Sequence, residues 1–287
     1  MRALVFSGGG AFGAYQAGAW RALEDAGFGP QILVGASIGA VNAAAVARGA
    51  TGRDLERWWR DPRSNVFQWN WPPRAVALFD TRLWRARLEE LYREFPRFQP
   101  GIRLLVTLTE LPGAAVRVAA GEEVTPLCVL ASCALPGVSP PVKWRGRWYL
   151  DGGLFCRMPL GLAAEAGATD IVAVDLLAAP PSTLLRGIAV ASVAVRRLLR
   201  GGAEPDLSGV PPGTRLRVIS SPEPLGGVRD TLRWNPALVE RWIQAGYRDA
   251  TAALESRAAE ASSPQPLHQT PSAAQPSKPS MDRAAPQ

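Results

Sequence analysis

Short apolar runs alternate with stretches of helical spacing along residues 1–50 of this chain. An apolar run of a few residues that ends at glycine is typical of a buried strand, whereas apolar residues at every third or fourth position are typical of a helix. We expect strands at Arg2–Ser7 and Gln31–Gly35, and helices at Gly13–Ala26 and Ile38–Arg48. This repeated order of strand, tight turn and helix predicts a parallel sheet with crossover helices.

The same patterns continue through most of the chain. The further helices that we expect are Thr51–Arg60, Thr81–Phe95, Pro126–Leu135 and Asn235–Ser256. The further strands that we expect are Ile102–Thr109, Ala115–Ala119, Asp170–Leu176 and Arg215–Ser220. A hairpin over Val142–Leu150, turning at Arg145-Gly146, is expected to deliver Asp151 at its end.

Composition predicts a domain boundary and a reducing cellular compartment. The C-terminal residues are mostly Ala, Ser, Pro and Gln, so we expect one domain over residues 1–257 and a disordered tail over residues 258–287. Three cysteines without paired spacing, Cys128, Cys133 and Cys156, favour free thiols in a reducing compartment over a disulfide framework. These features predict a cytoplasmic protein.

Charge changes this picture only slightly. Lys and Arg number 32 against 25 Asp and Glu, which gives a formal net charge of +7. This excess favours anionic partners such as lipid head groups, although it is spread along the chain. No apolar stretch has the length of a membrane span, so peripheral contact with an anionic membrane surface is the most that we expect. No recognised nucleic-acid module accompanies the basic residues, so we expect no nucleic-acid partner. The oligomeric state stays open.

The segment Gly35-Ala36-Ser37-Ile38-Gly39 has the G-x-S-x-G form of a serine-hydrolase nucleophile elbow, in which Gly35 and Gly39 allow a tight turn. A Ser-His-Asp triad needs an imidazole, but the single histidine of the chain, His268, lies in the expected tail. Either the pattern is a packing turn with a spare serine, or another residue acts as the base. One histidine and no Cys-x-x-Cys motif also argue against a metal site.

Asp151 is the candidate base. It stands in Tyr149-Leu150-Asp151-Gly152-Gly153, where Gly152 and Gly153 minimise backbone crowding at the carboxylate. A carboxylate with its ordinary pKa near 4 is a poor base, but desolvation in a closed cleft would raise that pKa. In isolation, an aspartate before two glycines is more often an ordinary turn residue.

A glycine-rich loop, Gly8-Gly9-Gly10-Ala11-Phe12-Gly13, follows the first expected strand. Its amides could donate to an oxyanion or to a dinucleotide pyrophosphate. A dinucleotide site needs an acidic residue at the end of the second strand, but that strand ends on Ser37. The pattern therefore argues against a nucleotide, and we expect no cofactor. A glycine-rich turn without a ligand is the structural alternative.

Together, the segments Ser7–Gln16 (SGGGAFGAYQ), Gly35–Gly39 (GASIG) and Ala131–Gly153 resemble the patatin-like phospholipase family, over most of residues 1–176. The resemblance implies a three-layer α/β/α fold with a central, mostly parallel sheet, and the hydrolysis of lipid acyl esters. It also implies a catalytic dyad and an oxyanion loop. The residues concerned are Ser37 as nucleophile, Asp151 as base, and Gly8, Gly9, Gly10 and Gly13 in the loop.

Two positions depart from the family pattern. Phe12 stands where the glycine loop commonly carries Arg or Lys, and Arg157 stands where an Asn often follows the Asp-Gly-Gly motif. Without a cation at Phe12, oxyanion stabilisation would fall to backbone amides. These two departures motivate one alternative, a non-catalytic lipid-binding or scaffold protein on the same frame. An acyltransferase is a further alternative, because it differs from a hydrolase only in what resolves the acyl-enzyme.

Five of the ten tryptophans lie between Trp58 and Trp84, interleaved with arginines. Aromatic side chains beside cations suit a membrane interface or a lid over an acyl groove. The alternative is that these rings pack a helical flap over the core. The arginine-flanked segment Leu184–Leu199 has the same two interpretations, of which an ordinary helix that covers the sheet is favoured. The five arginines of the first segment are Arg57, Arg60, Arg63, Arg74 and Arg82.

Overall fold

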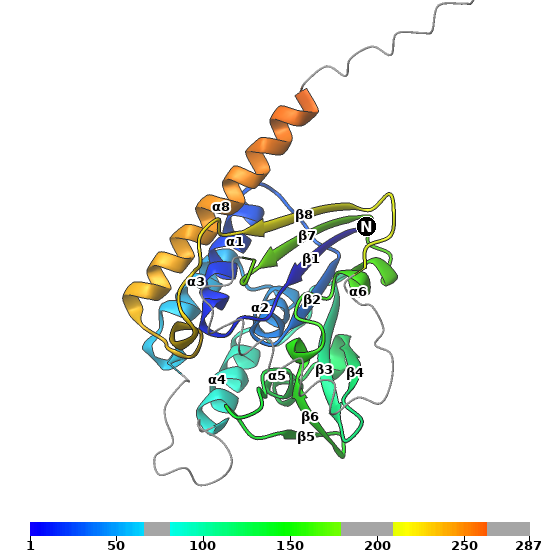
Figure 1. Cartoon of the computed structure of the whole chain (residues 1–287), viewed down its shortest axis with the longest axis vertical. Coiled ribbons are helices and arrows are strands. Elements are labelled where there is room, and N and C mark those ends of the chain that lie inside the picture. The colour runs from blue at the N-terminus through cyan, green and yellow to red at the C-terminus, as the bar shows by residue number, and fades with distance from the viewer. Residues whose placement is uncertain (66–80, 179–208, 263–287) are drawn as a thin grey trace, which may run out of the picture.

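The computed structural model describes residues 1–65, 81–178 and 209–262 (Figure 1). In these residues eight strands form one sheet along the path β5-β6-β3-β2-β1-β7-β8, and β4 also pairs with β3. The strands are β1 (Arg2–Phe6), β2 (Ile32–Ala36), β3 (Arg103–Leu111), β4 (Ala115–Ala120), β5 (Val142–Trp144), β6 (Arg147–Asp151), β7 (Asp170–Asp175) and β8 (Arg215–Ser220). Strands β1, β2, β3, β7 and β8 run parallel, so the expected mostly parallel sheet is confirmed.

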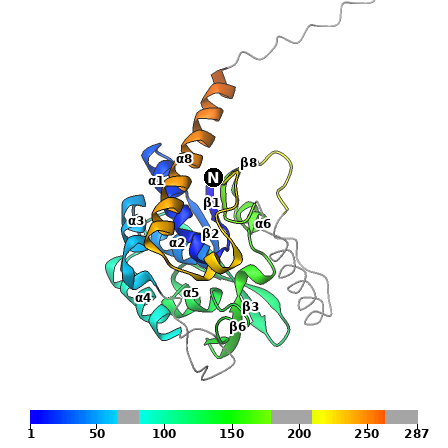
Figure 2. The ribbon, with the colours of Figure 1, turned by 60° about the vertical axis from the view of Figure 1, so that its left-hand side comes forward.

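Helices cover both faces of this sheet. They are α1 (Gly13–Asp25), α2 (Ile38–Ala47), α3 (Gly52–Arg60), α4 (Thr81–Glu94), α5 (Pro126–Ser132), α6 (Leu160–Glu165) and α8 (Pro236–Ser262). Figure 2 shows α6 on the opposite side of the sheet from α1, α2 and α8. The central strands are therefore buried on both faces, which explains why they read as continuous apolar runs.

Alternate residues of β1 enter two separate hydrophobic clusters. Leu4 and Phe6 pack into the large cluster that is shared with α1, α2 and α8. Ala3 and Val5 pack into the smaller cluster that is shared with α6. Successive side chains of a strand point to opposite faces, so the two clusters are the cores between the sheet and its two helical layers. The three-layer α/β/α arrangement is thus observed.

Strands β2 and β6 meet end to end along one edge of β3. Ala36, the last residue of β2, pairs with Thr107, and Asp151, the last residue of β6, pairs with Leu108. Strand β4 pairs with β3 across both of these positions, so it occupies the other edge. Because β6 is antiparallel to β3, the two strands approach from opposite directions and their carboxyl ends converge.

Several expected boundaries change in the structure. Helix α5 ends at Ser132 rather than Leu135, because Pro136 cannot continue a helix. Helix α8 runs to Ser262, past its expected end at Ser256. The short helix α6 had no counterpart in the sequence pattern. Segments 184–199 and 263–287 lie outside the described residues, so the expected tail stays a prediction.

The expected hairpin is present, with the turn at Arg145 (φ 48°) and Gly146 (φ 82°). Positive φ at both turn residues is the geometry that suits a two-residue connection between twisted antiparallel strands. In the described part of the chain, no helix combines the length and the apolar character that a membrane crossing requires.

Helices α1 and α8 touch backbone to backbone through two glycines. A Cβ at Gly18 would lie 1.9 Å from the Ile243 carbonyl oxygen, and a Cβ at Gly246 would lie 2.0 Å from the Tyr15 carbonyl oxygen. The Tyr15 hydroxyl also donates a hydrogen bond of 3.0 Å to Asp249 Oδ2. This contact holds α8 against the helix that follows the glycine loop.

We expect Gly18→Ala to lower the free energy of unfolding by about 1–3 kcal/mol, because the methyl group meets backbone atoms and the two helices must separate. The measurement is chemical denaturation followed by circular dichroism. Gly113→Ala is the matched control, since a Cβ there has no heavy atom within 4 Å. Equal stabilities of the two variants would contradict this account of the contact.

Candidate active site

Ser37 occupies a strained turn between β2 and α2. Its backbone angles are φ 55° and ψ −129°, a conformation that a non-glycine residue adopts only when its surroundings enforce it. A Cβ at Gly39 would lie 2.2 Å from the Phe6 carbonyl oxygen, and a Cβ at Gly35 would lie 2.5 Å from the Gly39 carbonyl oxygen. The two glycines of the G-x-S-x-G pattern therefore let the turn close against β1.

The Ser37 side chain contacts Asp151. Ser37 Oγ donates a hydrogen bond of 2.6 Å to Asp151 Oδ2, and the Gly153 amide donates one of 2.7 Å to Asp151 Oδ1. The Asp151 backbone is also held, because its amide donates to the Ala134 carbonyl at 2.9 Å and its carbonyl accepts from Thr109 Oγ1 at 2.8 Å. The convergence of β2 and β6 on β3 thus brings together two residues that are far apart in the sequence.

Gly152 and Gly153 position Asp151 in different ways. A Cβ at Gly152 would lie 1.9 Å from the Thr107 carbonyl oxygen, so only glycine lets the chain turn this close to β3. Gly153 supplies the amide that binds the carboxylate.

Burial raises the pKa of the Asp151 carboxyl to about 6, although the hydrogen bonds from Ser37 and Gly153 lower it in part. The residue is 4% exposed. A carboxylate with this pKa is largely ionised at neutral pH and is also basic enough to accept a proton during a reaction. The Asp151 carboxylate therefore has the position and the proton affinity of a general base for the Ser37 hydroxyl.

Four glycines shape the loop that precedes α1. A Cβ at Gly8 would lie 3.2 Å from Ser37 Cβ, so the loop passes directly beside the serine. The Gly8 amide is already engaged, since it donates to the Arg157 carbonyl at 2.9 Å. Gly13 packs against Ile38, where a Cβ would lie 2.6 Å from Ile38 Cγ1.

Other amides near Ser37 remain available. Among the described residues, the backbone amides of Gly9, Gly10 and Ile38 have no hydrogen-bond partner. Gly9 and Gly10 are half-buried, and Ile38 is the first residue of α2, whose N-terminus carries the positive end of the helix dipole. These amides can stabilise a negative charge on an oxygen atom beside Ser37 Oγ.

Phe12, the first departure from the family pattern, is fully buried. Its ring packs edge-on against Trp242 of α8, with ring centroids 5.0 Å apart and an interplanar angle of 76°. Aromatic packing on α8 therefore holds the loop at the position where a cation was expected to steady it.

Arg157, the second departure, joins the glycine loop to the end of β7. Its guanidinium forms a two-pronged ion pair with Asp175, with Arg157 Nη1 on Oδ1 and Arg157 Nη2 3.2 Å from Oδ2. Asp175 Oδ1 also accepts a hydrogen bond of 2.9 Å from the Leu177 amide. Because the Arg157 carbonyl binds the Gly8 amide, this ion pair fixes the loop beside the serine.

Two buried amide side chains to which no sequence motif assigned a role, Gln16 and Asn42, span the loop. Gln16 Nε2 donates to the Ser7 carbonyl at 2.8 Å, while Asn42 Nδ2 donates to the Gly13 carbonyl at 3.0 Å and to Gln16 Oε1 at 2.8 Å. Trp59 Nε1 completes the chain by donating to Asn42 Oδ1 at 3.1 Å. A single amide within the otherwise apolar helix α2 was the signal that could have identified Asn42.

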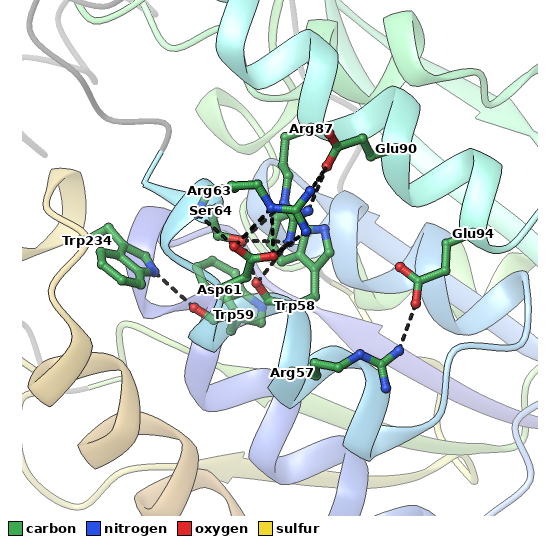
Figure 3. A network of polar contacts seen from close by, with 10 residues as sticks. All are labelled: Arg57, Trp58, Trp59, Asp61, Arg63, Ser64, Arg87, Glu90, Glu94 and Trp234. Atoms are coloured by element: carbon green, nitrogen blue, oxygen red, sulfur yellow. Dashed lines mark hydrogen bonds and ion pairs between the residues drawn. The ribbon is translucent and has the colours of Figure 1, made fainter.

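The tryptophans near Trp58 pack inside the protein. Trp58, Trp59 and Trp84 are at most 9% exposed, and the Trp58 ring contacts both of the others. Figure 3 shows the polar network around them, in which Arg87 Nη2 donates to the Trp58 carbonyl at 3.3 Å and Trp234 Nε1 donates to the Trp59 carbonyl at 2.9 Å. For these three rings the packing alternative is therefore correct. Trp69 and Trp71 lie outside the described residues.

The cysteines are free thiols, as expected. Burial raises the pKa of Cys128 to about 12 and that of Cys133 well above its ordinary value. Because the thiolate is the reactive form, these two cysteines are poor nucleophiles at neutral pH. In the described part of the chain, no group of three or more His, Cys, Asp or Glu residues is placed to hold a metal ion.

Comparison with known proteins decides the family. The model of the patatin-like phospholipase family matches residues 4–164. This chain belongs to that family. It is 26% identical to patatin-like phospholipase domain-containing protein 7 of Rattus norvegicus over 183 residues, which cover 61% of this chain and 13% of that protein. It is 25% identical to the uncharacterized protein YqhO of Bacillus subtilis (strain 168) over 203 residues, which cover 60% and 70% of the two chains.

This patatin-like chain therefore spans only a small part of the mammalian relatives that it matches. Among solved structures, VipD from Legionella pneumophila has a TM-score of 0.50 at 17% identity, with 89% of this chain and 67% of VipD covered. That likeness supports the three-layer fold.

We expect Asp151→Asn to gain stability relative to the wild type as the pH rises. The folded protein holds the Asp151 proton more tightly than the unfolded chain does, because the pKa of this carboxyl is raised from 3.8 to about 6 on folding. The unfolding free energy of the wild type therefore falls as the pH rises through this range. Asparagine stays neutral, so the difference in unfolding free energy should shift by about 2–3 kcal/mol in favour of the variant between about pH 4 and pH 8.

The measurement is denaturant unfolding of both proteins across this pH range. Any constant effect of the amide on packing cancels, because only the change of the difference with pH is used. A difference that does not vary with pH would show that Asp151 has an ordinary pKa.

Asn42→Leu should lower the unfolding free energy by about 2–4 kcal/mol, because it leaves the Gly13 carbonyl, Gln16 Oε1 and Trp59 Nε1 without their partner in the core. Thermal or chemical denaturation tests this. Gln244→Leu is the matched control, since this exposed amide binds only Glu240 on the same helix. The buried amide chain would be unimportant for the fold if both variants were as stable as the wild type.

Proposed function

We propose that this chain is a serine acyl hydrolase that acts on lipid acyl esters through a dyad of Ser37 and Asp151. The observation that carries the proposal is the 2.6 Å hydrogen bond between Ser37 Oγ and the buried Asp151 carboxylate. Membership of the patatin-like phospholipase family supports a lipid substrate.

The first half of the reaction forms an acyl-enzyme. Asp151 Oδ2 accepts the Ser37 proton while Ser37 Oγ attacks the carbonyl carbon of the ester. The carbonyl oxygen becomes an oxyanion, which the free amides of Gly9, Gly10 and Ile38 are placed to stabilise. The tetrahedral intermediate then collapses, and the proton on Asp151 passes to the departing alcohol oxygen.

The second half releases the fatty acid. Asp151, again ionised, takes a proton from a water molecule while the water oxygen attacks the acyl carbonyl carbon. Collapse of this second intermediate frees the carboxylic acid, and Ser37 Oγ regains its proton from Asp151. Both halves need the ionised carboxylate, so the rate should fall as the pH drops below the Asp151 pKa of about 6.

The two departures from the family pattern no longer favour an inert scaffold. Phe12 packs against Trp242, and Arg157 pairs with Asp175. Neither interaction engages Ser37 Oγ or Asp151, and both hold the glycine loop in place. The geometry therefore supports catalysis better than lipid binding alone.

Ser37→Ala tests this function. We expect it to lower the hydrolysis of a medium-chain nitrophenyl ester by at least about 10³-fold and to abolish covalent labelling by a fluorophosphonate, because the nucleophile is lost. His268→Ala is the matched control, which should retain both activities if the carboxylate alone serves as base. Hydrolysis by Ser37→Ala at the wild-type rate would contradict the mechanism. Loss of activity in His268→Ala would show that a triad, rather than a dyad, catalyses the reaction.

A further inference from the structure

Trp148 is the most exposed large apolar side chain in the described part of the chain, at 51%. It lies on β6, whereas the tryptophans first considered for a membrane interface, Trp58, Trp59 and Trp84, are buried. The surface around it is hollowed by about 430 Å³. The hollow is lined by Trp148, Leu111, Pro112, Pro140 and Pro141, which together are called the Trp148 patch below.

Along β3, the patch lies beyond the carboxyl end of β2, the strand that leads into Ser37. Asp151 pairs with Leu108 of β3, and Trp148 pairs with Leu111, three residues farther along the strand. At about 3.4 Å per residue, Trp148 lies about 10 Å from the catalytic candidate along β6. Figure 1 shows β5 and β6 at the bottom of the view.

The lining of the patch suits acyl chains better than a peptide. All five side chains are apolar. The three prolines have no backbone N–H, so they offer no donor with which a peptide could pair. An exposed indole beside apolar residues is the arrangement by which aromatic side chains settle at the boundary between lipid tails and head groups.

One cation lies beside the exposed indole, and two more belong to the same hairpin. Lys143 pairs with Trp148 across the hairpin, and its Nζ lies 6.0 Å from the Trp148 ring. The Arg145 and Arg147 side chains are 60% and 67% exposed. Their ion-pair partners, Glu123 and Glu110, are only 22% and 23% exposed, so the hairpin presents mainly positive charge to the solvent.

We propose that the Trp148 patch is the surface by which this protein docks on an anionic phospholipid bilayer. The indole and the proline-lined hollow would enter the interface, and Lys143, Arg145 and Arg147 would contact the anionic head groups. The inference rests on the proposed function for its purpose, but binding can be measured without catalysis.

The first experiment measures sedimentation of the Ser37→Ala protein with vesicles, so that no lipid is consumed. With phosphatidylcholine vesicles that contain phosphatidylglycerol, we expect Trp148→Ala to lower the partition coefficient by about tenfold. Lys143→Glu should also weaken binding, and more so at low salt. Leu216→Ala is the matched control, because Leu216 is 42% exposed but lies on β8 at the opposite end of the strand order.

Binding that is unaffected by Trp148→Ala, or that is lowered equally by Leu216→Ala, would overturn the proposed surface. If the protein binds pure phosphatidylcholine vesicles as strongly as the mixed vesicles, the proposed preference for an anionic membrane is overturned. Circular dichroism of each variant establishes that the fold is retained.

The second experiment separates docking from catalysis in the protein with Ser37 intact. Trp148→Ala should hydrolyse a water-soluble nitrophenyl ester at the wild-type rate but act more slowly on the mixed vesicles. If the wild type hydrolyses neither substrate yet vesicle binding still depends on Trp148, the docking surface stands and the proposed function fails. If both substrates are hydrolysed at wild-type rates by Trp148→Ala, the docking surface fails and the proposed function stands.

Discussion

The end-to-end meeting of β2 and β6 on one edge of β3 is the constraint on which the candidate site depends. Backbone hydrogen bonds of two strands with consecutive residues of β3, Thr107 and Leu108, set the distance between Ser37 and Asp151. No separate device is needed to bring the hydroxyl to the carboxylate. The same pairing buries Asp151 between β3 and α5, and this burial raises its pKa. Proximity and proton affinity therefore have one structural origin.

The glycine loop is held by three unlike contacts. Phe12 packs on α8, Arg157 links the loop to β7 through Asp175, and the amide chain through Asn42 ties it to α2. A loop that must present free amides cannot be stabilised by those amides, so its stability has to come from side chains and carbonyls. The sequence shows that Phe12 replaces a cation, but it does not reveal that the Trp242 ring lies opposite.

The tryptophans show that local composition does not predict which aromatic side chains are exposed. Tryptophans beside arginines fit either a membrane surface or a packed flap, and periodicity cannot separate the two. In the fold, Trp58 stacks on Trp84 of α4, and Trp59 packs against Gly13 and bonds to Asn42. Their carbonyls bind Arg87 and Trp234. Trp148, in contrast, stands on β6, next to the outermost strand β5, and among the described residues it is the most exposed large apolar residue. The exposure of a side chain depends on which distant segments pack against it, and the local sequence does not show this.

The sequence by itself determined most elements of this protein and its family. Its apolar periodicity located the parallel strands and their helices, and three short motifs identified the family and the candidate residues Ser37 and Asp151. Local patterns carry this information because strands, helices and tight turns depend on neighbouring residues. Only the tertiary structure decided that the two residues touch, that Asn42 and Arg157 support the loop, and which tryptophan faces the solvent. These outcomes depend on distances between distant segments, which are set by strand register and core packing.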